Sequence, residues 1–234
     1  MGRPVKPLIS RERAARAALG VIDVHGLDAL SLEMVASRLG VKAPSLYYHF
    51  KHKAELLEEV ARLILLDVKA PDPKTLDWKE AMVELSVATR RSILAHPNAA
   101  LLLLQFFPRH TLLAAYDYWL APSPLPPELH LVMLEGTEKL TFGAALFEAA
   151  YRARSIEPMP LFDRTKLPHL AAAMRANLLG EEELFMATLR SFLIGLETVA
   201  ASMTAATAKA KPAGTAKKMS KVVATKKKPV KRKA

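Results

Sequence analysis

Apolar residues recur every three or four positions along most of this chain, which is the spacing of amphipathic α-helices. A first helix is predicted over 10–25. A second is predicted to begin at the N-cap Ser31 and to end at Gly40, because glycine adopts the left-handed conformation that closes a helix. A third is predicted to begin around Pro44 and to end near Phe50. Two short helices joined by a tight glycine turn predict a helix-turn-helix.

The same periodicity continues after Lys53 and predicts a long helical region. We expect a connecting helix and then further helices, over 54–68, 77–96, 98–107, 111–121, 127–154 and 181–206. The 98–107 stretch is apolar nearly all round, which is typical of a helix inside a core. Prolines between 155 and 168 predict a loop. The predicted fold class is all-α, with an N-terminal three-helix helix-turn-helix domain and a C-terminal helical domain.

The third helix carries the side chains best suited to binding DNA. Leu46 and Phe50 are four positions apart and share its inner face. Its other faces present polar tips, from Ser45, Tyr47, Tyr48 and His49. The flanking lysines are Lys42, Lys51 and Lys53. Hydroxyl and imidazole groups bind phosphates and base edges, and lysines neutralise phosphates, so this helix is predicted to lie on duplex DNA.

Direct contact with bases is assigned to Pro44, Ser45 and Tyr48. The alternative is that Leu-Tyr-Tyr-His-Phe is an aromatic core segment, because tyrosines are often half-buried. His49 and His52 lie three positions apart without a third ligand nearby, so no metal site is expected.

From Leu-Gly-Val at the turn to Pro-Ser-Leu-Tyr-Tyr-His-Phe-Lys, the order of residues over about 10–60 resembles the tetracycline-repressor (TetR) family of bacterial transcription regulators. The resemblance implies an all-helical homodimer that reads a palindromic operator in double-stranded DNA. It also implies a C-terminal effector-binding and dimerisation domain that takes a small molecule. Together these features would make the chain a ligand-responsive transcription repressor.

The resemblance also implies roles at individual positions. Phosphate contacts are implied for Ser31 and Tyr47, and base-facing positions for Ala43, Pro44, Ser45 and Tyr48. Lys53 matches the lysine that opens the next helix. Ala43 and Lys42 depart from the pattern, because some members carry a polar base-reading residue at the first position and a capping residue at the second. Recognition of the base sequence is therefore expected to rely more on apolar contact with thymine methyl groups.

Charge is concentrated at the C-terminus, where residues 208–234 hold 11 Lys and Arg and no Asp or Glu. The net charge of the whole chain is also +11, so residues 1–207 are formally neutral. A tail of this composition is expected to be disordered and to bind phosphates without sequence preference. If the tail dominated, the chain would be an architectural, nucleoid-type DNA-binding protein, and this alternative stays open. The other reading is that the tail only improves solubility.

Two long predicted helices carry stripes of small residues that let another backbone approach closely. The stripes are Gly136, Gly143 and Ala150 on one helix and Ala187, Ser191, Gly195 and Thr198 on the other. We expect these helices to form a four-helix bundle with their copies in a second subunit. The competing interpretation is that they pack within one subunit.

A small effector, largely apolar, is expected to bind among the helices after Pro73. The candidate lining residues are Gln105, Phe106, His110, Tyr116, Trp119, Met133, Thr137 and Phe147. Each of them also fits an ordinary core position.

Other classes of protein lack support in the sequence. Without Cys, a phosphate-binding loop or a nucleophile elbow, we expect no enzyme, no catalytic residue and no cofactor. No membrane partner is expected, and the chain is placed in the bacterial cytoplasm at the nucleoid. The predicted division is a flexible arm (1–9), a helix-turn-helix domain (10–53), a connecting helix (54–70), a ligand-binding and dimerisation domain (71–207) and a disordered tail (208–234).

Overall fold

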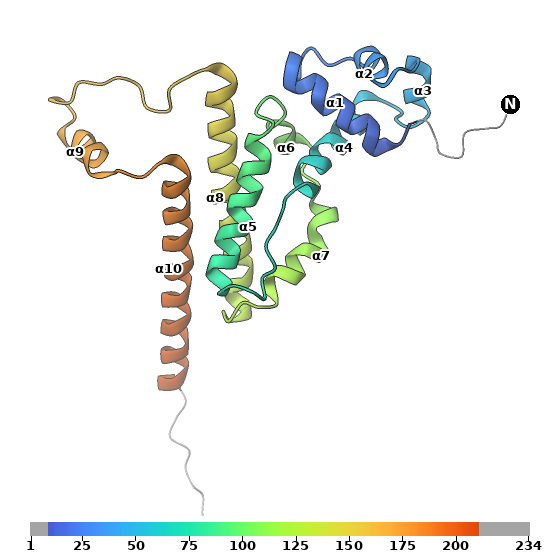
Figure 1. The fold of residues 1–234 in the computed structure, drawn as a ribbon. Helices are drawn as coiled ribbons and strands as arrows, with labels where there is room; N and C mark the ends of the chain where they lie inside the picture. The colour runs from blue at the N-terminus through green and yellow to red at the C-terminus, as the bar shows by residue number, and fades with distance from the viewer. Residues whose placement is uncertain (1–8, 211–234) are drawn as a thin grey trace, which may run out of the picture.

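The structure, a computed structural model, describes residues 9–210, which form α-helices and no strand (Figure 1). The helices are α1 (Arg11–His25), α2 (Leu32–Leu39), α3 (Ala43–Tyr47), α4 (Lys53–Leu66), α5 (Trp78–Leu94), α6 (Leu102–Gln105), α7 (Arg109–Leu120), α8 (Pro127–Arg154), α9 (Pro168–Ala176) and α10 (Glu181–Ala210). The all-α prediction is therefore confirmed. The predicted basic arm before Ile9 and most of the basic tail lie outside the described residues.

Local capping explains where the first helices begin and end. The Ser10 hydroxyl accepts a hydrogen bond from the Arg13 N–H at 3.1 Å, and the Ser31 hydroxyl accepts one from the Met34 N–H at 3.2 Å. Gly40 has φ 69° and ψ 31°, a left-handed conformation that ends α2. The next N–H, of Val41, bonds to the Ala36 carbonyl at 3.0 Å and turns the chain into α3.

One hydrophobic core runs without a break from the N-terminal helices into the C-terminal domain. It includes Ile22 of α1, Leu46 of α3 and Leu56 of α4 at the N-terminal end. It continues through Ile64 of α4 to Ala145 of α8. Because α4 contributes to both ends, the two predicted domains share this core rather than meeting at a separate interface.

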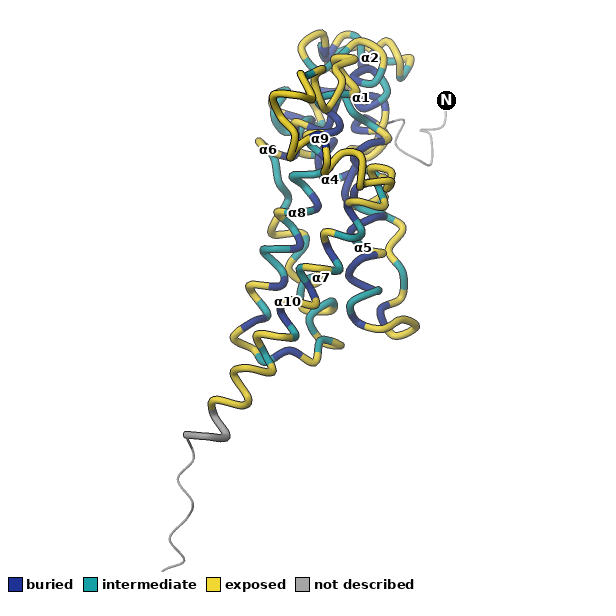
Figure 2. Tube along the Cα trace, turned by 90° about the vertical axis from the view of Figure 1, so that its left-hand side faces the viewer, coloured by how far each residue is buried: buried dark blue, intermediate teal, exposed yellow. Residues whose placement is uncertain are grey.

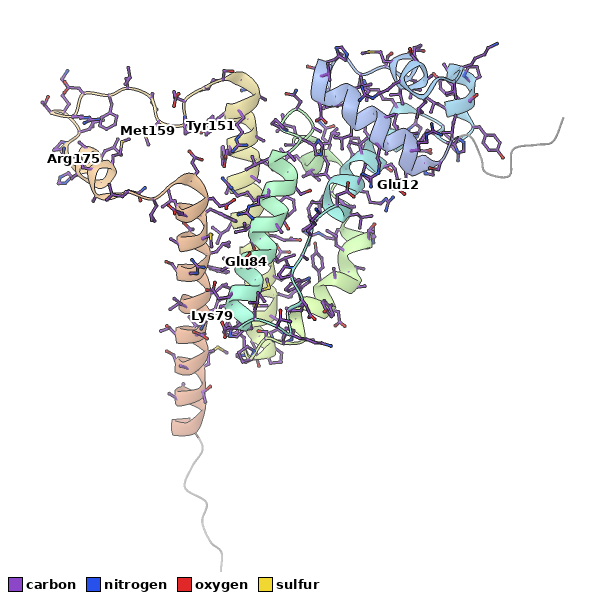
Figure 3. The ribbon with its side chains drawn as sticks, viewed as in Figure 1. Glu12, Lys79, Glu84, Tyr151, Met159 and Arg175 are labelled. Atoms are coloured by element: carbon purple, nitrogen blue, oxygen red, sulfur yellow. The ribbon has the colours of Figure 1, made fainter. Side chains whose placement is uncertain are left out.

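A second core lies between α5, α8 and α10, which run side by side in Figure 1. Trp78 of α5, Met133 of α8 and Leu189 and Leu193 of α10 pack together there. Lys79 lies on the side of α5 that faces α10, and its ammonium is 2.7 Å from Glu197 Oε1 (Figure 3). The C-terminal part of α10, by contrast, is exposed (Figure 2).

Residues 155–180 form an arm that stands away from this body and carries α9 (Figures 1 and 3). The prolines before residue 168 do form an irregular segment, as predicted, but α9 was not expected. The arm is apolar and open to solvent, since Leu161 and Leu178 are 104% and 91% exposed.

Several predicted boundaries are wrong. The helix expected over 98–107 is reduced to the four residues of α6, and turns precede it. Leu104 is 68% exposed, so this stretch is not buried on all sides. Helix α3 ends at Tyr47 instead of near Phe50. Ile9, placed in the flexible arm, is 5% exposed and packs into the first core. Helix α10 extends to Ala210, beyond the expected start of the tail at residue 208.

By length and composition alone, the Glu181–Ala206 part of α10 could cross a membrane, with a mean hydropathy of 1.5. No membrane segment was expected. A single helix of this kind is weak support for membrane insertion, because helices of soluble cores have the same composition. Here Phe185, Leu189 and Leu193 are buried against the second core, which accounts for one apolar face of the helix.

A buried ion network ties three helices of the C-terminal domain together. Arg90 of α5 is 3% exposed and donates to Glu148 of α8, and its Nη1 is 3.3 Å from Glu182 Oε2 of α10. Glu148, 8% exposed, also accepts a hydrogen bond from Arg152 Nη2 at 2.5 Å. Because the Arg90 and Glu148 charges are desolvated, removing one of them would leave the other buried with less compensation.

We therefore expect Arg90→Met to lower the free energy of unfolding by about 3–5 kcal/mol, because Glu148 would stay buried after losing one of its two arginine partners. The measurement is urea denaturation followed by circular dichroism. Lys139→Met is the control, because it removes an ion pair to Glu135 whose side chains are 75% and 41% exposed. Equal effects of the two substitutions would show that the buried network does not hold the helices.

Candidate functional site

The segment 42–50, here called the recognition segment, presents one buried and one exposed face. Leu46 and Phe50 are 0% and 1% exposed, whereas Tyr48 is 89% exposed and Tyr47 is 52% exposed. Lys42, Pro44 and Ser45 are exposed as well. The proposed aromatic core therefore holds for Phe50 but not for the tyrosines, whose hydroxyls are available to a partner.

The other predicted DNA-contacting residues are partly engaged inside the protein. Ala43 and His49 are half-buried, and the Tyr48 and His49 rings meet edge to face at 5.3 Å. Lys53 Nζ donates to the Leu30 carbonyl at 2.6 Å, so this ammonium fixes the start of α4 against the loop before α2. The Ser31 hydroxyl caps its own helix but keeps its hydrogen for a second partner.

Two contacts behind the recognition segment hold its position. The Arg11 guanidinium donates to the His49 carbonyl and lies 4.4 Å from the centre of the Phe50 ring. The Lys51 N–H donates to Glu55 Oε2 at 3.0 Å, and this hydrogen bond lowers the pKa of the Glu55 carboxyl. Arg11 is therefore a positioning residue for the exposed face.

The C-terminal domain contains a cavity of about 260 Å³ bounded by α4, α5, α7 and α8. Tyr116 and Trp119 of α7 and Met133 and Thr137 of α8 line it. These are four of the eight predicted lining residues, and their role in binding an effector stays a prediction. Helix α7 forms the loosest wall, because none of its residues is buried.

The other four predicted lining residues do not border this cavity. Gln105 and His110 are exposed, and Phe106 packs against the first core. Phe147 is 68% exposed on the opposite side of α8. The predictions failed because they assumed a continuous helix over 98–107 and could not tell which face of α8 turns inward.

Sequence reasoning missed the part of the cavity wall that comes from α4 and the chain just after it. Leu65, Leu66 and Val68 line the cavity there. On α8, Thr141 and Phe142 also border it, and Thr141 follows Thr137 by one turn. The four-residue spacing from Met133 to Thr141 was the sequence signal that could have identified this face.

Helix α4 connects the cavity to the recognition segment. Its first residue is Lys53, bound to the Leu30 carbonyl, and its last turn forms cavity wall. The Ser92 hydroxyl of α5 donates to the Ile64 carbonyl at 2.6 Å. The Arg16 guanidinium of α1 donates two hydrogen bonds, of 2.8 and 3.1 Å, to the Asp67 carboxylate, which directly follows α4. A displacement at the cavity would therefore reach α1 and the start of α4, next to the recognition segment.

The small-residue stripes have different surroundings at different heights. A Cβ on Gly136 would lie 2.2 Å from the Phe192 ring of α10, so this glycine serves close packing within the subunit and its assignment to a dimer interface is wrong. A Cβ on Gly143 or Gly195 would meet no described atom within 4 Å. The remaining residues of the two stripes, Ala150, Ala187, Ser191 and Thr198, stay predicted interface positions.

Residues 15–60 match a family described as bacterial regulatory proteins, tetR family. An HTH-type transcriptional regulator of Saccharopolyspora erythraea is 31% identical over 97 residues, covering 42% of this chain and 41% of that protein. The class C tetracycline repressor protein of Escherichia coli is 33% identical, covering 39% and 43%. The chain thus matches about two fifths of the length of these curated relatives.

Similarity in structure extends much further than similarity in sequence. The apo structure of ActR from Streptomyces coelicolor has a TM-score of 0.67 at 25% identity and covers 85% of this chain and all of that one, 100%. ActR has also been solved in complex with (S)-DNPA, described as a TetR family protein. The helical C-terminal domain therefore shares a fold with these structures as well.

The Arg16–Asp67 contact predicts a pH dependence. The hydrogen bond from Arg16 lowers the pKa of the Asp67 carboxyl, so the folded protein binds this proton less readily than the unfolded chain does. The resulting stabilisation is present at pH values above the pKa of Asp67 in the unfolded chain, which is about 4. It is lost as the pH falls through the lower pKa that Asp67 has in the folded protein. We expect Asp67→Asn to be less stable than wild type at pH 7, with the difference closing below about pH 4.

Thermal unfolding monitored from pH 7 to pH 3 measures this effect, with Asp117→Asn as the control at an exposed position on α7. A difference between Asp67→Asn and wild type that does not change with pH would show that the ion pair contributes nothing.

Proposed function

Because this chain belongs to the tetR family of bacterial regulatory proteins, we propose that it is a sequence-specific DNA-binding transcription regulator, a repressor released by a small effector. The observation that carries the proposal is the recognition segment, where Leu46 and Phe50 are buried and Tyr48 is 89% exposed. Such an arrangement fixes the helix on its inner side and leaves its outer side for the major groove.

Individual roles on DNA follow from exposure. Pro44, Ser45 and Tyr48 are proposed to contact bases, together with the half-buried Ala43. Phosphates are proposed to contact Ser31, Lys42, Tyr47, His49 and Lys53. Lys53 is proposed to make its phosphate contact with one of the two ammonium hydrogens that Leu30 leaves free.

The cavity is proposed as the effector site because it is enclosed by mainly apolar residues and touches the last turn of α4. An effector that fits only a shifted α4 would favour a form whose recognition segments no longer match the operator. Binding of effector and of DNA would then oppose each other equally. ActR, a protein of similar fold, has been solved with a small molecule, which supports a ligand-responsive role.

The protein is proposed to act as a homodimer through α8 and α10. Around the open glycines Gly143 and Gly195, large apolar side chains are exposed on both helices, including Phe147, Ile194 and Val199. Binding to successive major grooves on one face of DNA requires two recognition segments about 34 Å apart, which a two-fold dimer can present. The operator would therefore be palindromic.

The remaining parts of the proposal concern organisation and location. The helix-turn-helix domain, the connecting helix and the effector domain are proposed as the working parts of the chain, and they share one core through α4. A cytoplasmic location at the nucleoid, with no cofactor, follows from the proposed role. The architectural alternative is less favoured, because a built recognition segment and a cavity have no use in a protein that binds DNA through its tail.

The test is selection of sites from a random duplex library by the full chain at roughly 150–200 mM salt, where nonspecific contacts weaken. We expect a palindromic motif for wild type. Tyr48→Ala is expected to reduce the base preference of the motif at the positions under the recognition segment. Lys42→Ala removes an exposed charge and is expected to lower the affinity for all sites alike. Recovery of no motif by the wild type would support the architectural alternative and overturn the proposal.

The dimer has its own test at matched glycines of α8. Gly143→Leu is expected to yield monomers of unchanged fold, because the new side chain meets only open space within its own subunit. Gly136→Leu is expected to lower the unfolding temperature instead, because it collides with Phe192. Sedimentation velocity and thermal unfolding distinguish the two effects. A Gly143→Leu protein that sediments as wild type would place the interface elsewhere.

A further inference from the structure

Two buried threonine hydroxyls on α8 have no hydrogen-bond partner among the described residues. Thr137 and Thr141 are 6% and 3% exposed, and both line the cavity. They lie one turn apart and so share the face of α8 that points toward α5. A buried hydroxyl without a partner costs about 1–3 kcal/mol, so an arrangement that repeats on successive turns requires a reason.

Other hydroxyls on the long helices show that a partner was available. Ser and Thr side chains elsewhere on α5 and α10 donate to the carbonyl four residues earlier, at 2.7 to 3.1 Å: Ser86, Thr89, Thr188, Ser191, Thr198, Ser202 and Thr204. Thr137 and Thr141 make no such bond. Their hydroxyls can therefore turn toward an occupant of the cavity without breaking any existing interaction.

The rest of the cavity wall restricts the charge of that occupant. Among the described lining residues, Glu138 is the only charged one, and it already accepts hydrogen bonds from the Tyr116 hydroxyl and from Arg109, at 3.2 Å. Burial and the bond to Glu138 raise the pKa of Tyr116, which keeps the phenol neutral. Because no described lining residue is a cation and Glu138 already has its own partner in Arg109, an anionic ligand would lose its hydration without gaining an opposite charge.

The rest of the lining is mainly apolar and partly aromatic. Leu65 and Leu66 come from α4, Leu112 and Trp119 from α7 and Phe142 from α8, and the two aromatic rings add flat surfaces. Apolar ligand atoms are therefore favoured everywhere except beside the two threonines.

We propose that the effector is a neutral, mainly apolar, aromatic molecule whose carbonyl oxygen accepts a hydrogen bond from the hydroxyl of Thr137 or Thr141. This inference rests on the proposed function of the cavity as the effector site. The hydroxyl pair fixes the orientation of the ligand, and its apolar end then presses on the last turn of α4. A carbonyl satisfies the buried donors, which a hydrocarbon of the same shape would leave unpaired.

The test compares three probes of nearly equal shape by isothermal titration calorimetry on the full chain: 2-acetylnaphthalene, 2-ethylnaphthalene and 2-naphthoate. We expect the ketone to bind roughly 2- to 12-fold more tightly than the hydrocarbon, which is the contribution of one net hydrogen bond. The carboxylate is expected to bind most weakly. In the double variant Thr137→Val and Thr141→Val, the preference for the ketone should disappear while the hydrocarbon binds as before.

Two control variants separate this role from a structural one. Thr89 lines the same cavity, but its hydroxyl is already bonded to the Leu85 carbonyl. The preference for the ketone should therefore persist in the Thr89→Val variant. Thr141→Ser keeps a hydroxyl and should also keep the preference. The unfolding temperature of the unliganded double variant should not fall, because each substitution removes an unpaired buried hydroxyl.

A ketone preference that survives in the double variant would overturn the proposal, as would tighter binding of 2-naphthoate. If none of the probes binds, the cavity does not accept this class and the inference fails. Failure of the proposed function is seen separately, as the absence of a selected DNA site, because the library experiment contains no probe.

Discussion

The packing of α4 into one continuous core is the constraint on which the other features of this molecule depend. Leu56 and Val60 are fully buried in the part of α4 that packs with α1, and Ile64 is 1% exposed in the same core nearer the C-terminal helices. An interior packed at crystal-like density does not absorb a displacement gradually, so α4 has to move as a unit. That rigidity makes a cavity at one end of α4 relevant to an exposed helix at the other.

Polar contacts set the limits within which α4 can move. The Lys53 ammonium holds its start, and the Ser92 hydroxyl and the Arg16–Asp67 pair hold its end. In contrast, α7 covers the cavity without a single buried residue. Helix α7 is therefore the most deformable wall of the cavity, and the buried Arg90 network keeps α5, α8 and α10 fixed behind it.

The surfaces left open by this arrangement differ in chemistry. The recognition segment exposes hydroxyls and flanking lysines, which suit a polyanion. The outer faces of α8 and α10 expose large apolar side chains around glycines that pack against nothing in their own subunit, which suits a second copy. The cavity offers two hydroxyls in an apolar setting, which suits neither of those partners.

The sequence by itself determined the features that depend on neighbouring residues. Ser10, Ser31 and Gly40 mark the ends of the first helices because capping hydrogen bonds form within three or four positions. The same local order placed Tyr48 outside and Phe50 inside, and its resemblance to the TetR family held for residues 15–60.

Only the tertiary structure decided which faces of the long helices turn inward. Gly136 and Gly143 belong to one stripe of α8, yet one meets Phe192 and the other meets open space. Phe147 and Thr141 are equally plausible pocket residues in the sequence, but the first faces solvent and the second lines the cavity. The reason is geometric: a helix of 28 residues meets α5, α7 and α10 at different heights, and their positions are set by contacts distant in the chain.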